Sequence, residues 1–227
     1  MLDFLREIDT NVFLELNQLH STFGDAFMST FTGKLIWVPM YAVIVYILYK
    51  NLNWKVATCF AVGIILTIAL ADSVCARVIR PLAERLRPAN LDNPISGFVH
   101  IVDGYRGGIY GFPSCHAANS FALATFLSFL FRTRWVITTA FLWAAINSYS
   151  SLYIGVHYVG DLLVGSLIGI TFAFALYYTS RYVAVTTLSY NPKTANQTQP
   201  HELWFLPATF ALTLLAILIY ATCIAIA

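Results

Sequence analysis

Charged residues are scarce in this chain of 227 residues, where they make up 11% of the sequence. A soluble domain averages about 25%. Hydrophobic residues account for 59%, and the mean hydropathy is +0.70. The formal net charge of +2 is too small to indicate a nucleic-acid partner. The shortage of charge therefore predicts a membrane protein rather than a large water-soluble domain.

Patterns that bind metals or form disulfides are also missing. The four cysteines form no CxxC pair and have no metal-ligand spacing: Cys59, Cys75, Cys115 and Cys223. Three of them lie in apolar runs, where cysteine usually acts as a small hydrophobic residue. The sequence has no cluster of acidic residues that would hold magnesium. We therefore expect neither a metal ion nor another cofactor.

Long apolar runs are what the chain has instead. A spanning helix needs roughly 20 mostly apolar residues. Six segments approach this length: residues 33–50, 55–79, 115–132, 135–155, 157–180 and 204–226. Four of the five tryptophans fall near their ends, as in an aromatic belt. We expect an all-α, polytopic bundle of six transmembrane helices.

The whole chain, residues 1–227, is predicted to form a single membrane domain. Its parts are an amphipathic N-terminal helix over residues 1–30, a core over 31–180, a polar connector over 181–203 and the last span over 204–226. In the first part, apolar residues recur at helical spacing with acidic residues between them. This pattern favours an interfacial helix on the bilayer, and the alternative is a cap packed on other helices.

The distribution of positive charge predicts the orientation. An even number of spans places both termini on one side, together with the loop over residues 80–114. The connections on the opposite side carry basic residues close to the span ends: Lys50, Lys55, Arg132, Arg134, Arg181 and Lys193. Because basic residues near span ends mark the cytoplasmic side, we expect both termini and the 80–114 loop to lie outside the cytoplasm.

Three polar stretches fall on that outer side: "RPLAERLRP" from Arg80, "FPSCHAANS" around His116, and "SSLYIGVHYVGD" with His157 and Asp161. The histidine and aspartate are four residues apart, and Arg80 and Arg87 are seven apart, so each pair would share one face of a helix. Arginines here also serve as lipid anchors, and a serine before a helix also serves as its cap. Several ionisable groups together at a bilayer are functional candidates.

The residue types favour phosphoryl transfer. Histidine forms covalent intermediates, and an aspartate bonded to one ring nitrogen leaves the other nitrogen free to attack. A second histidine is suited to protonate the departing oxygen. Arginine guanidinium groups neutralise phosphoryl oxygens, and the helix N-terminus expected at Ser114 adds amide donors for an anion.

The three stretches resemble the motifs of the type 2 phosphatidic acid phosphatase family of integral membrane lipid phosphatases. That family has Lys, six residues, Arg-Pro; then Pro-Ser-Gly-His; then Ser-Arg, five residues, His, three residues, Asp. Here the spacing is kept from Arg80 to Arg87, from Ser114 to His116, and from His157 to Asp161. The resemblance implies that His157 is the nucleophile, that Asp161 orients it and that His116 is the general acid. It also implies that phosphate is bound by Arg80, Arg87 and Ser114.

The chain departs from the family pattern at three positions. Arg80 replaces a lysine, Cys115 replaces a glycine, and Ser151 replaces an arginine that normally holds the phosphate. Arg106, on a glycine-rich loop, is a candidate for the missing cation; the alternative is an ordinary solvent-exposed charge. If Arg106 binds phosphate, Arg106→Ala should cost far more activity than Arg85→Ala.

The resemblance implies a metal-independent phosphatase that acts on a phosphorylated lipid of the bilayer through a phosphohistidine. Size, predicted orientation and family likeness favour a bacterial inner membrane, with the site facing the periplasm. Lipid A is the favoured substrate, and undecaprenyl diphosphate and phosphatidylglycerophosphate are alternatives. A membrane protein that binds or moves lipid without cleaving it is an alternative of another class. Nothing in the sequence indicates an oligomeric state.

Overall fold

The computed structural model describes residues 2–192 and 201–227, and the regular structure in these ranges is helical. The main helices are α1 (Leu2–Asn17), α2 (Thr22–Phe31), α3 (Val38–Asn51), α4 (Trp54–Ser73), α5 (Arg80–Ala83), α6 (Cys115–Phe131), α7 (Arg134–Tyr153), α8 (Val159–Thr187) and α10 (Phe205–Ile226). A 3₁₀ turn, Leu35–Trp37, precedes α3, and a π-helical turn, Val74–Ile79, joins α4 to α5. Each of the six predicted spans overlaps one helix of 14 or more residues. The regular structure of the described residues is helical, so the all-α prediction is confirmed.

Three helical stretches are long and apolar enough to cross a membrane: Trp54–Ala83, Val159–Thr187 and His201–Ile226. A fourth results if α2 and the Leu35–Asn51 stretch, bent by 65°, count as one span. By length and composition the count is therefore three or four, below the predicted six. The two helices that fall short are α6, which has only 17 residues, and α7, which carries several serines and threonines.

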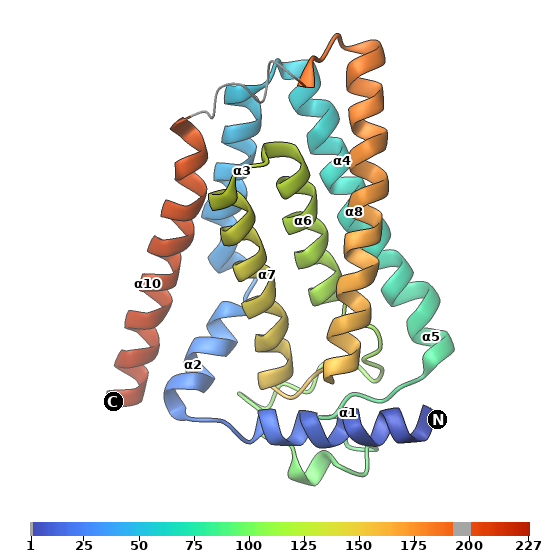
Figure 1. The fold of residues 1–227 in the computed structure, drawn as a ribbon. Helices are drawn as coiled ribbons and strands as arrows, with labels where there is room; N and C mark the ends of the chain where they lie inside the picture. Colours follow the sequence, from blue (N-terminus) through green and yellow to red (C-terminus); the bar gives the residue numbers. More distant parts are fainter. Residues whose placement is uncertain (1, 193–200) are drawn as a thin grey trace.

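Helix α6 lies at the centre of the bundle, between α4, α7 and α8 (Figure 1). Gly165 and Gly169 on α8 allow the two helices to approach closely, because a Cβ at either position would overlap the backbone at Ser114, the N-cap of α6, or at Ala118. Small residues four apart serve this purpose in membrane helices. A hydrogen bond joins the N-terminal ends of α6 and α8: the Ser114 amide donates to the Asp161 carbonyl at 2.9 Å.

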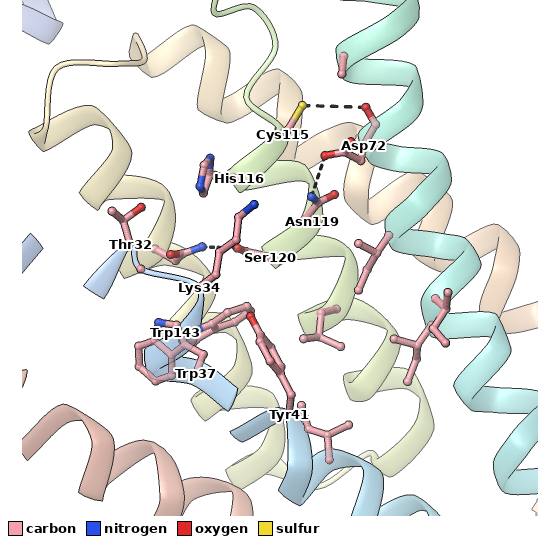
Figure 2. A pocket seen from close by; sticks show the side chains of 18 of the residues that line it. Thr32, Lys34, Trp37, Tyr41, Asp72, Cys115, His116, Asn119, Ser120 and Trp143 are labelled. Carbon is pink, nitrogen blue, oxygen red and sulfur yellow. Dashed lines mark hydrogen bonds between the residues drawn. The ribbon is translucent and has the colours of Figure 1, made fainter. Parts of the chain in front are cut away.

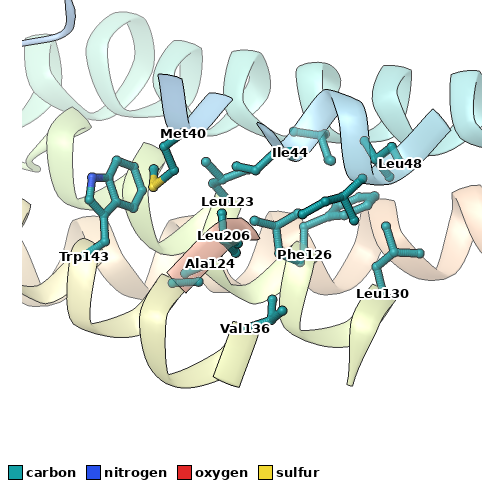
Figure 3. Close-up of a cluster of buried hydrophobic side chains, with 14 of the residues drawn as sticks. Met40, Ile44, Leu48, Leu123, Ala124, Phe126, Leu130, Val136, Trp143 and Leu206 are labelled. Atoms are coloured by element: carbon teal, nitrogen blue, oxygen red, sulfur yellow. The ribbon is translucent and has the colours of Figure 1, made fainter. Parts of the chain in front are cut away.

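A hydrophobic core fills the space between α3, α6, α7 and α10. Figure 3 shows Met40 and Ile44 of α3 beside Leu123 of α6, with Trp143 of α7 nearby. Outward-facing side chains are apolar as well: Ile65, Leu167 and Leu212 are each more than 60% exposed. Apolar residues on both the inner and the outer face are typical of helices in a bilayer.

Both termini, the α5–α6 loop and the α7–α8 junction lie at one end of the bundle, as the sequence predicted, and the short α3–α4 and α6–α7 loops lie at the other (Figure 1). Lys193 and the rest of residues 193–200 in the polar connector lie outside the described residues.

Helix α1 lies across the end that carries the termini (Figure 1). Its Phe13 is fully buried, with its ring 5.2 Å from that of Tyr158, whereas Phe4, Leu5 and Ile8 are exposed. The helix therefore has one face packed on the bundle and a separate exposed apolar face.

Candidate active site

The carboxylate of Asp161 holds His157 at the start of α8. The helix begins at Val159, so His157 precedes it and the two residues do not share a helical face as predicted. Asp161 Oδ2 instead accepts from the Tyr158 amide at 3.1 Å and lies 3.2 Å from His157 Nδ1. Both side chains are almost completely buried. The pair is thus built as part of a helix cap, which fixes the ring.

The other ring nitrogen faces Arg87. Arg87 Nη1 lies 3.0 Å from His157 Nε2 and also donates to the Val156 carbonyl at 3.0 Å. Because arginine only donates, Nε2 must accept, so the proton is on Nδ1 and is donated to Asp161. Burial lowers the pKa of His157 to about 4, which keeps the ring neutral near pH 7. This is the tautomer that a histidine nucleophile requires.

The two arginines reach the site from different elements. Arg80 begins α5, but the helix ends at Ala83 and Glu84 adopts a left-handed conformation (φ 44°), so Arg87 lies in the loop. The expectation that Arg80 and Arg87 share one helical face is therefore wrong, although both line the same cavity. Arg80 Nη2 donates to the Pro113 carbonyl at 3.0 Å.

The residue that replaces the family glycine also contacts this arginine. Cys115 Sγ accepts from Arg80 Nη2 at 3.2 Å. Its thiol therefore lies against Arg80, and both residues line the same cavity.

A cavity of about 670 Å³ joins the polar groups to an apolar slot. Its polar end is lined by Arg80, Arg87, His116 and His157, and its apolar part by side chains of α3 and α4 such as Ile44. Figure 2 shows His116 together with the polar and aromatic residues around it. Four of the seven predicted site residues are thus brought together around one space.

Two buried guanidinium nitrogens at the polar end of the cavity have no hydrogen-bond partner among the described residues, Nε of Arg80 and Nε of Arg87. Buried donors are normally paired, so these two fit an anion held in the cavity. In the described part of the chain, no three His, Cys, Asp or Glu side chains are grouped to hold a metal ion.

Two predicted phosphate ligands do not line the cavity. Ser114 is fully buried and acts as the N-cap of α6, its Oγ accepting from the Ala117 amide at 3.3 Å. Arg106 Nη1 donates to the Ala89 carbonyl at 2.6 Å. Ser151, where the family has arginine, is also fully buried, and its hydroxyl bonds to the Ser148 carbonyl. None of the three groups faces the space beside His157 in this structure.

Sequence reasoning missed Arg85 and Asp9. Arg85 Nη1 contacts Asp161 Oδ1 at 3.1 Å and Asp9 Oδ2 at 2.7 Å, and its guanidinium lies 3.8 Å from the centre of the Tyr158 ring. Asp9 Oδ1 accepts from the Gly160 amide at 2.8 Å. Helix α1 therefore braces the carboxylate that holds His157. The sequence signal for Arg85 was its place in the arginine cluster of residues 77–87, but such a cluster is also typical of lipid anchors.

Two arginines and two histidines line one cavity of a membrane-type helix bundle, and a buried carboxylate holds one of the histidines. This set of groups is suited to phosphoryl transfer. The sequence model of the PAP2 superfamily matches residues 56–184. The chain belongs to this superfamily, as its three motifs predicted.

The relatives agree with this assignment. The chain is 50% identical to a lipid A 4'-phosphatase of Bacteroides thetaiotaomicron over 97% of its own length and 98% of the relative's. It is 31% identical to a lipid A 4'-phosphatase of Porphyromonas gingivalis, over 74% and 71% of the two chains. The crystal structure of Aquifex aeolicus LpxE has a similar fold, with a TM-score of 0.56 and 23% identity over 74% of this chain and 94% of that one.

Proposed function

We propose that this lipid phosphatase removes the 4'-phosphate of lipid A through a phosphohistidine. The observation that carries the proposal is the continuity of the cavity, which joins two arginines and two histidines to an apolar slot between α3 and α4. Such a space suits a phosphate attached to a lipid. The choice of lipid A rests on the relative that is 50% identical over nearly the full chain.

In the first step, His157 Nε2 attacks the phosphorus atom. The bond between phosphorus and the sugar oxygen breaks, and His116 donates a proton to that oxygen. The ring of His157 becomes cationic, and Asp161 stabilises it through the proton on Nδ1. The products are the dephosphorylated lipid and a phosphohistidine.

In the second step, water hydrolyses the phosphohistidine. His116, now neutral, accepts a proton from the water as it attacks phosphorus, and the bond to Nε2 breaks. Inorganic phosphate leaves, and His157 and His116 return to their starting protonation states. No metal ion is required, because Arg80 and Arg87 supply the positive charge.

Arg87 must change partner during this cycle. In the structure its Nη1 lies against Nε2, the atom that attacks. A bound phosphoryl group would offer stronger, charged acceptors to Arg87 and release the nitrogen. Ser114 would contribute indirectly. Its hydroxyl caps α6, and this fixes the start of the helix beside His116.

For the membrane we propose six spans within a single domain, residues 1–227. The spans are the bent α2–α3 pair, α4, α6, α7, α8 and α10. The exposed apolar face of α1 would lie in the interface on the side of the site. The basic residues of the short loops at the other end favour a periplasmic site in a bacterial inner membrane.

The experiment is phosphate release by purified protein from lipid A carrying both phosphates, from undecaprenyl diphosphate and from phosphatidylglycerophosphate. We expect release from lipid A at the 4' position, identified by mass spectrometry. His157→Ala, matched to the wild type in its melting profile, should release none. Preference for another lipid would refute the substrate assignment, and activity in the His157 variant would refute the nucleophile.

A further inference from the structure

The cavity contains a third cation that the motifs do not include. Among the described residues that line it, Lys34 is the one lysine, beside Arg80 and Arg87. Lys34 lies between the end of α2 and the turn that precedes α3, where the chain bends by 65°. Its side chain is exposed, so solvent and ligands reach its amine.

The bend is fixed by aromatic packing. The buried Trp37 donates its indole N–H to the Phe31 carbonyl at 2.8 Å, and the two rings lie 4.7 Å apart. Gly33 closes the turn, with its amide 3.1 Å from the Thr30 carbonyl. The backbone on both sides of Lys34 is therefore held in place, and its side chain enters the cavity from a defined point.

Lys34 lines the cavity from the α2–α3 bend, whereas Arg80 and Arg87 line it from α5 and the loop that follows α5. Figure 2 shows its side chain extending from the α2–α3 bend toward His116. Arg80 and Arg87 already donate to protein carbonyls, whereas Lys34 makes no hydrogen bond or ion pair with a described residue. Its ammonium group is thus free to bind an anion beside His116.

We infer that Lys34 binds the phosphate group of the substrate and replaces the motif arginine that is absent at Ser151. This inference rests on the proposed function. Its ligand is a phosphate monoester oxygen, and an ammonium binds it as a point charge. Arg106 would not perform this task, because it is bound to the Ala89 carbonyl and does not line the cavity.

The test compares charge variants of the full-length protein in detergent. Lys34→Met should lower kcat/KM for phosphate release from lipid A by about 10- to 150-fold, the effect of one hydrogen bond between charged groups. Lys34→Arg should retain activity within about threefold of the wild type by the same reasoning. The matched control is Lys55→Met, at the opposite end of the bundle, where the lysine lies only over the Trp54 ring.

Vanadate, a phosphate analogue, gives a readout that does not need turnover. It should raise the melting temperatures of the wild type, of Lys34→Arg and of the control. The rise for Lys34→Met should be much smaller. Equal vanadate shifts in Lys34→Met and wild type, or no shift in the wild type, would overturn the inference. So would equal losses in Lys34→Met and Lys34→Arg, because the charge would then be irrelevant. If lipid A is not hydrolysed but vanadate still stabilises the wild type more than Lys34→Met, only the proposed substrate is refuted.

Discussion

Replacement of Arg85 by methionine tests whether the contacts behind His157 support catalysis. Methionine keeps an unbranched apolar side chain but removes every donor. Arg85 Nη1 lies 3.1 Å from Asp161 Oδ1 and 2.7 Å from Asp9 Oδ2, and its side chain is 16% exposed. Without the guanidinium, Asp161 keeps its bonds to His157 and the Tyr158 amide but loses the charged partner on its other oxygen.

The size of the effect follows from one hydrogen bond between charged groups, about 1.5–3 kcal/mol. Since about 1.36 kcal/mol corresponds to a factor of ten, kcat/KM should fall by about 10- to 150-fold. The partial exposure of Arg85 favours the lower half of this range. Arg85 does not line the cavity, so the loss should appear in kcat with KM nearly unchanged.

The assay is phosphate release from lipid A, with melting in detergent to confirm folding. Asp9→Asn is the matched control: it weakens the contact to α1 but leaves the bond from Arg85 to Asp161, so its loss of kcat should be smaller. The sequence alone led to the expectation that Arg106→Ala is far more damaging than Arg85→Ala, and the structure leads us to expect the reverse order. A folded Arg85→Met protein within twofold of wild-type kcat would refute this reasoning.

Four further outcomes are expected. Ser151→Arg should lower the melting temperature and the yield of folded protein, because Ser151 is fully buried and a guanidinium there has no space or partner; a gain in activity would contradict this. Gly165→Val should destabilise the protein by roughly 1–3 kcal/mol, since its Cβ would overlap the Ser114 backbone, whereas Gly97→Ala, with open space around it, should melt like the wild type. Chelator should leave phosphate release intact while vanadate inhibits it, and restoration of lost activity by magnesium would argue for a metal mechanism. The folded-state pKa of His157 is about 4 and its unfolded value is about 6.5, so between these values the unfolded state binds more protons than the folded state. The wild type should therefore lose stability relative to His157→Gln as the pH falls through this window. An equal change in the melting temperatures of the two proteins across the window would count against a buried neutral ring.

The sequence by itself determined the positions of the helices. A bilayer requires every backbone polar group to be paired within the segment, so a long apolar run has few alternatives to a helix. Each of the six predicted runs accordingly overlaps a helix of 14 or more residues, although only three or four stretches among the described residues are long and apolar enough to span. Motif spacing likewise singled out Arg80, Arg87, His116 and His157, and these four line one cavity.

Only the tertiary structure decided how the site is held together and which other residues take part. Arg85 meets Asp9 and Asp161 because α1 folds back across the end of the bundle. Lys34 reaches the cavity because α2 and α3 meet at a bend whose Trp37 packs on α7 and α10. Periodicity and motif spacing describe neighbours within one helix or loop, where the geometry repeats with a known period. Arg85 and Asp161 are 76 positions apart, so their contact depends on how separate segments of the chain pack. Local sequence patterns carry no information on such packing.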